Sequence, residues 1–100
     1  MPLIPFEFRA KVWLYDGAAA WHFATLPKGL SAKLKRYFGG ARPGFGSIRV
    51  RASTGGSAWA TSIFPDSKRG AYLLPLKAEV RRKEGIVAGK ARAFKIEIEA

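Results

Sequence analysis

A Leu-Pro pair that leads into a short basic stretch of helical pattern occurs twice in this chain of 100 residues. The first copy joins Leu26-Pro27 to residues 32–36, and the second joins Leu74-Pro75 to residues 78–82. Strand-like residues precede and follow each copy, and proline ends a strand because it has no N–H to give to the ladder. The pattern predicts one strand, helix, strand unit used twice.

Alternation of apolar and polar residues predicts most of the strands. It is clearest at residues 6–14, where one face is apolar and the other is charged. Asp16-Gly17 then predicts a turn into a return strand at 20–25. Further strands are expected at 47–52, 58–63, 72–74 and 91–98, with a turn at 54–57 and a further turn that starts at Pro65-Asp66.

Each copy of the repeat is expected to carry a short helix. The first has an apolar face with helical spacing, Ser31 as its expected N-cap and Gly39 as a left-handed stop. The second is expected over residues 77–83, with Gly85 as its stop. Between the two units, residues 39–46 are rich in glycine and form the expected main loop.

These elements add up to about six strands and two short helices in one domain that spans residues 1–100. Short strands with frequent turns are typical of a small barrel or sandwich. Cysteine is absent and 48% of the residues are hydrophobic, so the fold rests on packing alone. We therefore expect a mainly β protein.

No segment has the pattern of an export signal or a membrane span. Residues 1–5 lack the basic stretch and the long apolar run of a signal peptide. No apolar run approaches the roughly 20 residues that cross a bilayer. We expect a soluble cytoplasmic protein with no membrane partner.

Residues with catalytic or metal-binding chemistry are sparse. His22 is the single histidine, and its place in the middle of a strand indicates a structural or surface role. Thr61, Ser62 and Asp66 lie close in sequence, but their spacing does not support a hydrolytic triad with His22. One histidine without cysteine argues against a transition-metal site, and no glycine-rich nucleotide loop is present. We expect no enzyme activity, no cofactor and no metal.

The three tryptophans fall on separate predicted strands. Tryptophans in strands mostly fill cores, so we expect Trp21 and Trp59 inside. Trp13 shares a face with Arg9 and Lys11 and is expected to be partly exposed.

The chain has 18 Lys and Arg against 7 Asp and Glu, a formal net charge of +11. Such a charge attracts polyanions, but it also serves simply to keep a small protein in solution. Arg49 and Arg51 share one strand face at a spacing of about 7 Å, comparable to successive phosphates, beside a loop that carries Arg42. A second cluster joins Arg81 and Arg82 to other cations. The candidate binding residues are Arg42, Arg49, Arg51, Arg81 and Arg82, with Lys68, Arg69 and Lys77 near the second cluster.

Three runs between Gly46 and Gly89 resemble a bacterial family of unknown function, the domain-of-unknown-function family nineteen-oh-five. They are Gly-Ser-Ile-Arg-Val-Arg-Ala, Gly-Gly-Ser-Ala-Trp-Ala-Thr-Ser-Ile-Phe-Pro, and the run from Gly70 through Leu74-Pro75 to Gly89. The resemblance implies a small β-barrel of the double-split type, in some members fused to a YdeI/OmpD-associated bacteriocin-protection domain. It implies no activity, since none is established for the family. Lys90 departs from the pattern, which usually has an acid there.

A looser resemblance links residues 74–98 to the swapped-hairpin motif of AbrB and MazE regulators. Those proteins build one barrel from two chains and bind DNA through basic residues on the shared face. The internal repeat suggests that this chain supplies both halves itself, as a monomer with an internal pseudo-two-fold axis.

Two functions from different classes remain open. The first is a non-enzymatic module that binds nucleic acid or another acidic partner through a basic face. The second is an accessory domain that receives a small molecule or a protein at the barrel mouth or at the glycine-rich loop.

Overall fold

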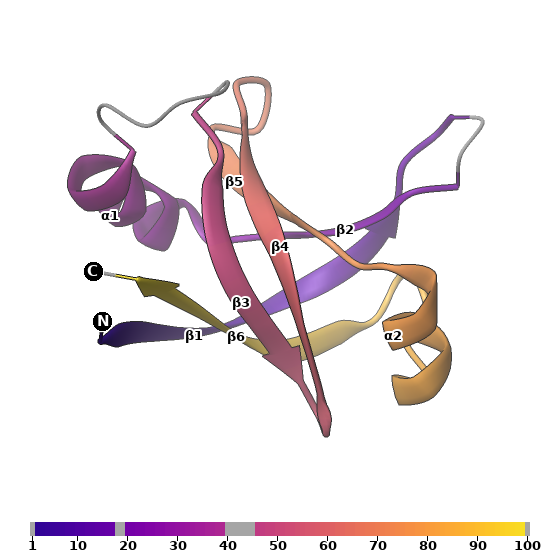
Figure 1. Cartoon of the computed structure of the whole chain (residues 1–100). Helices are drawn as coiled ribbons and strands as arrows, with labels where there is room; N and C mark the ends of the chain where they lie inside the picture. The colour runs from indigo at the N-terminus through magenta and orange to yellow at the C-terminus, as the bar shows by residue number, and fades with distance from the viewer. Residues whose placement is uncertain (1, 18–19, 40–45, 100) are drawn as a thin grey trace.

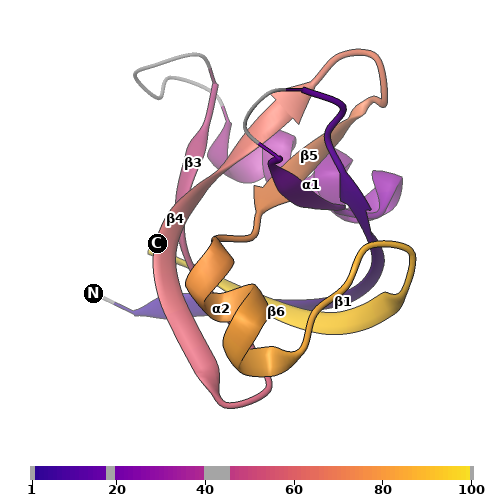
Figure 2. The same ribbon diagram turned by 90° about the vertical axis from the view of Figure 1, so that its right-hand side faces the viewer.

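The computed structural model of the chain describes residues 2–17, 20–39 and 46–99. These residues form a closed barrel in the strand order β1-β2-β5-β4-β3-β6, in which every neighbouring pair is antiparallel (Figure 1). Two helices lie on different sides of the barrel (Figure 2). The mainly β barrel with six strands and two short helices is thus confirmed. In chain order the elements are β1 (Leu3–Leu14), β2 (His22–Thr25), α1 (Lys28–Phe38), β3 (Ile48–Thr54), β4 (Ser57–Asp66), β5 (Ala71–Pro75), α2 (Ala78–Glu84) and β6 (Ala91–Glu99).

The alternating pattern of β1 places its apolar side chains inside the barrel. Phe8, Ala10 and Val12 are buried there, whereas the charged neighbours Arg9 and Lys11 are exposed. Burial of apolar surface stabilises by about 25 cal/mol per Å², so this inner face is the main source of stability. The other strands complete the core with Ile48, Val50, Ala52, Ile63, Leu74, Phe94, Ile96 and Ile98.

The β3–β4 hairpin closes through Gly55-Gly56, as predicted. Gly55 has a φ of +58°, which a tight hairpin turn needs and which a side chain disfavours. The turn that Pro65-Asp66 is expected to start follows them directly. Strand β4 continues through Asp66, and the Gly70 N–H donates to the Asp66 carbonyl at 2.8 Å across the turn.

Helix α1 begins three residues before its predicted N-cap. Pro27 is the N-cap residue, and proline suits a helix start because an N–H is not needed there. Ser31 lies inside the helix, where its Oγ accepts a hydrogen bond from the Tyr72 N–H at 3.0 Å. Gly39 ends the helix with a right-handed φ of −87°, so the predicted left-handed stop is wrong there. The prediction is confirmed for Gly85, which has a φ of 65°.

The two halves of the chain are related by a pseudo-two-fold axis through the β2–β5 pair. Ala24 lies opposite Leu74 in the register of this pair, with Phe23 opposite Pro75 on one side and Thr25 opposite Leu73 on the other. If β1 is exchanged with β4, β2 with β5 and β3 with β6, the barrel has the same set of neighbouring strand pairs as before. The repeat predicted from the sequence is therefore a property of the fold.

Two hydrogen bonds of 2.9 Å fix which residues correspond. The Leu26 N–H donates to the Tyr72 carbonyl, and the Leu76 N–H donates to the His22 carbonyl, so counterparts lie fifty positions apart. Leu26-Pro27 thus corresponds to Leu76-Lys77, and the predicted match with Leu74-Pro75 is wrong by two residues. A shift of two keeps side chains on the same face of a strand, which is why the pattern alone hides it.

Each half of the barrel has a split that a helix covers. Within the described residues, β1 pairs with β2 only over Val12–Leu14, and β4 pairs with β5 only over Phe64–Asp66. Helix α1 covers the first split, where the Phe38 ring meets the Phe6 ring edge-on at 6.1 Å between centroids. Helix α2 lies against β4 at the second split.

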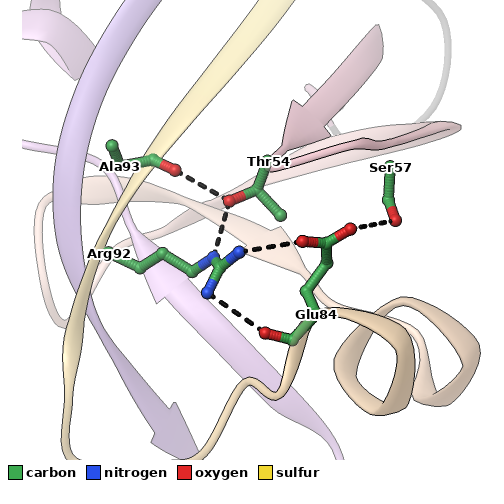
Figure 3. Close-up of polar contacts among 5 residues, drawn as sticks. All are labelled: Thr54, Ser57, Glu84, Arg92 and Ala93. Carbon is green, nitrogen blue, oxygen red and sulfur yellow. Dashed lines mark hydrogen bonds and ion pairs between the residues drawn. The ribbon is translucent and has the colours of Figure 1, made fainter.

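A polar network fixes the C-terminal end of α2 (Figure 3). The Glu84 carboxylate accepts hydrogen bonds from Ser57 Oγ at 2.5 Å and from Arg92 Nη2 at 3.1 Å. Arg92 Nε donates to Thr54 Oγ1 at 2.7 Å, and that hydroxyl donates to the Ala93 carbonyl at 2.8 Å. The network joins α2 to the β3–β4 hairpin and to β6.

Candidate ligand-binding pocket

The predicted arginines do not share one face among the residues that the structure describes. Arg42 lies outside those residues. Arg49 and Arg51 point outward from β3, and Arg51 lies opposite Glu97 of β6. Arg81 and Arg82 lie on α2. The two arginines of β3 thus have an acidic residue beside them, whereas Arg81 lines a pocket.

The pocket has a volume of about 480 Å³ and lies in the split between β4 and the start of α2. Its walls are mainly apolar and none of its lining residues is acidic. The lining residues come from the segment that enters β2 (Ala20, Trp21, His22), from β4 (Trp59, Ala60, Thr61, Phe64) and from the β5–α2 connection and α2 (Pro75, Leu76, Lys77, Ala78, Arg81).

Two half-exposed aromatic side chains border the pocket. Trp21 is 50% exposed and Phe64 is 42% exposed. The prediction that Trp21 fills the core is wrong, because Ala24 takes the inward place on β2 while Trp21 stacks on Phe23 at 5.9 Å. Trp13 is partly exposed as predicted and lies 5.2 Å from the same Phe23 ring.

Arg81 is held in place while its terminal nitrogens stay available. Its Nε donates to the Leu76 carbonyl at 3.0 Å, and its Nη atoms have no partner within the described part of the chain. Lys77 is half-exposed and reaches Glu79 only at 3.9 Å, a surface pair worth little. The pocket therefore has two cationic side chains that can bind an anionic ligand.

His22 brings a polarised imidazole to the pocket wall. Its Nδ1 lies 3.0 Å from the Ala20 carbonyl, which can only accept, so Nδ1 carries the hydrogen. In the neutral ring, Nε2 is then left as an acceptor. Ala20 itself has a φ of +51°, an uncommon conformation for a residue with a side chain.

Trp59 is 5% exposed, as predicted for a core residue, yet its indole N–H is not satisfied. Nε1 is buried and finds no acceptor in the ranges that the structure describes. By contrast, Nε1 of Trp13 donates to Thr25 Oγ1 at 2.8 Å. Buried indole N–H groups usually have a partner, so Trp59 marks a place where an acceptor is expected.

The pseudo-two-fold axis relates this pocket to a second pocket, of about 510 Å³, that Ser31 and Tyr72 line in the first half. There, the Tyr72 N–H donates to Ser31 Oγ and joins α1 to β5. The counterparts of Ser31 and Tyr72, fifty positions away, are Arg81 and His22. The arginine side chain has no acceptor atom, so α2 cannot make the same bond, and the terminal donors of Arg81 stay available in the pocket that it lines with His22.

The residues considered for a hydrolytic set do not gather at one site. Ser62 lies opposite Arg49, outside the pocket, while His22 and Thr61 line it.

The hydrogen bond from Arg69 to Asp66, 2.6 Å long, lowers the pKa of that carboxyl below its usual range. In the described ranges, no three acidic or histidine side chains come together as metal ligands do. In the described part of the chain, neither helix has the length and apolar character of a membrane span.

A comparison with protein families decides the affiliation of the chain. The family described as "Domain of unknown function (DUF1905)" matches residues 8–96, from β1 into β6. The chain belongs to this family. The match confirms the family resemblance seen in the sequence. A search of curated proteins found no match. Lys90, the departure from the family pattern, contributes its carbonyl to the Val12 N–H at 3.0 Å, a backbone contact that any residue type can make.

Sequence reasoning found Arg81 but missed the aromatic part of the pocket. Trp59 is buried between the exposed Ala58 and Ala60, and nothing local in the sequence relates it to Trp21 or Arg81, which lie elsewhere in the chain. Pairing the two repeat copies at fifty positions, instead of by their Leu-Pro pairs, would have aligned Ser31 with Arg81.

Proposed function

We propose that the protein is a non-enzymatic binding module for nucleic acid, which it contacts with the cations and aromatic rings around the pocket. One observation carries the proposal: Lys77 and Arg81 border the same pocket as the half-exposed rings of Trp21 and Phe64. Proteins that hold single strands combine positive charge for phosphates with aromatic rings for bases. We expect it to act in the bacterial cytoplasm, where such ligands occur.

The placement of the acids favours the pocket over the β3 face. Glu97 lies opposite Arg51, and Glu84 is used internally by Arg92. Asp66 pairs with Arg69 at 2.6 Å. No acid is among the described residues that line the pocket, and Glu79 reaches Lys77 only at 3.9 Å, so Arg81 is the cation that a phosphate meets there without a competing carboxylate.

Fluorescence anisotropy with labelled single-stranded and duplex oligonucleotides tests the proposal. Neutralising one phosphate contact on a single strand changes the slope of log affinity against log salt by about 0.7. The double variant Lys77→Gln/Arg81→Gln should therefore bind more weakly and reduce the slope by about 1.4. No binding of either oligonucleotide at low ionic strength would refute the proposal.

Two further double variants remove the same charge elsewhere. Arg9→Gln/Lys11→Gln changes the outer face of β1, and Arg49→Gln/Arg51→Gln changes the β3 face. We expect both to keep the wild-type slope nearly unchanged. If the β3 variant loses more affinity than the pocket variant, nucleic acid binds at β3 and not at the pocket.

A small acidic or aromatic molecule in the same pocket is the second candidate. The unsatisfied Nε1 of Trp59 and the volume of about 480 Å³ favour it, since that volume falls within the range of small-molecule sites. Thermal-shift screening separates the two candidates: a ligand at 100 times its Kd stabilises by about 2.7 kcal/mol. Specific stabilisation by a small molecule, with oligonucleotides inert, would favour this second function.

A further inference from the structure

We infer that the pocket receives one unstacked base of a single strand, and that Trp59 Nε1 donates a hydrogen bond to an acceptor on that base. The inference rests on the proposed nucleic-acid binding and gives it a ligand class: single strands in preference to duplexes. Its starting point is the one buried side-chain donor that finds no acceptor within the described residues.

The indole of Trp59 can only donate. A buried donor without an acceptor is costly, because it has lost its water and gained nothing in return. Carbonyl oxygens and ring nitrogens on base edges are acceptors, and thymine offers two such oxygens, O2 and O4. A base that enters against Trp59 thus supplies the kind of atom that the pocket lacks.

The rest of the pocket suits the other parts of a nucleotide. The walls beside Trp59 are mainly apolar, and Trp21 and Phe64 present half-exposed rings on which a neighbouring base can stack. Arg81, anchored through Nε, directs free donors to the same space, where a phosphate can accept them. A paired base in a duplex is stacked on both faces and cannot enter, so the base must be free of the stack.

Entry requires a small movement at the split. Trp59 Nε1 is covered in the unliganded protein, so a base reaches it only when the pocket wall moves. Within the described residues, β4 pairs with β5 only over Phe64–Asp66, and α2 lies against β4, whose earlier part pairs with β3 alone. Glu84 anchors the far end of α2, whereas Lys77 and Arg81 lie at the pocket. The wall that must move is therefore the N-terminal part of α2.

Binding of an oligothymidine of about eight nucleotides is compared with binding of the same backbone without bases and of a duplex of equal length. Stacking and the new hydrogen bond should make oligothymidine bind about tenfold or more tightly than the abasic strand. Trp59→Phe, which removes the N–H, should weaken oligothymidine binding about three- to tenfold and leave abasic binding unchanged. Equal affinity for the three ligands would overturn the inference, although the proposed function would survive through its salt dependence. Absence of all binding would overturn both.

NMR of the wild-type protein gives a readout that does not depend on the stability of a variant. The three indole N–H signals are assigned with Trp13→Phe, Trp21→Phe and Trp59→Phe. Addition of oligothymidine should move the Trp59 signal downfield and slow its exchange with water, while the Trp13 N–H, already bonded to Thr25, serves as the internal control. An unmoved Trp59 signal at saturation would refute the contact.

Discussion

Replacing Glu84 by alanine should destabilise the barrel, although this residue does not belong to the hydrophobic core. Its carboxylate accepts hydrogen bonds from Ser57 Oγ at 2.5 Å and from Arg92 Nη2 at 3.1 Å (Figure 3). Ser57 is only 8% exposed, so its hydroxyl would lose its acceptor in a place with little access to water. Arg92 would lose the partner of its charge.

The magnitude follows from the two bonds and the exposure of the partners. A hydrogen bond to a charged group contributes about 1.5–3 kcal/mol. The side chains of Arg92 and Glu84 are 29% and 14% exposed, and Arg92 keeps its bond to Thr54, so water and Thr54 compensate part of the loss. We expect a net loss of about 2–3 kcal/mol, which lowers the Tm of a 100-residue domain by about 10–20 °C.

Urea and thermal unfolding measure this loss, with Glu79→Ala as the matched control. Glu79 is on the same helix and removal of its carboxylate changes the charge equally, but it is 75% exposed and reaches Lys77 only at 3.9 Å. We expect the control to change stability by less than about 0.5 kcal/mol. If Glu84→Ala and Glu79→Ala lose the same amount, the network does not stabilise the fold as argued.

Two other substitutions test local geometry. Gly55→Ala should cost about 2 kcal/mol or more, because φ is +58° and a Cβ would overlap the Glu84 carboxylate. Gly56→Ala, whose Cβ would meet nothing within 4 Å, should cost less than about 1 kcal/mol, and equal losses in urea unfolding would contradict this account. Arg69→Gln should raise the pKa of Asp66 toward its usual value in an NMR titration, because the Arg69 hydrogen bond is the main cause that lowers it. A lowered pKa of Asp66 stabilises the folded state above the usual pKa, and this stabilisation is lost as pH falls through the lowered value. The difference in stability between wild type and variant should therefore shrink in strong acid to the part that comes from the Arg69 guanidinium, which lies 4.0 Å over the Trp13 ring. An unchanged titration midpoint of Asp66 would show that Arg69 is not the cause.

The strands could be predicted from the sequence because burial in a barrel imposes a period of two. Residues 6–12 alternate cleanly, although Leu14, which the pattern places on the apolar face, is half-exposed, and Gly55-Gly56 suits the two-residue turn of a hairpin. Helix starts were harder: Ser31 has the chemistry of an N-cap, yet its hydroxyl is used by Tyr72 of another element. Such a contact joins residues far apart in sequence, and no local pattern reports it.

The candidate site was only partly predictable for the same reason. Arg81 was found through its charge, but its role depends on Leu76, which anchors it, and on Trp59, which lies on a different strand. Arg51 looked equally suitable in sequence, and only the register of β3 against β6 places Glu97 opposite it. Charge can be read along the chain, whereas charge balance on a surface needs the pairing of strands.

The Ser31–Tyr72 bond has a consequence for how a duplicated fold can change. In a symmetric dimer of identical chains, every joint occurs twice, and sealing one joint seals the other. A single chain with two unequal halves is free of that constraint, because Ser31 and its counterpart Arg81 are encoded separately. One half can therefore keep a hydrogen bond between its helix and a strand while the other leaves its donors for a ligand, and substitutions at these two equivalent positions should change different properties of the protein.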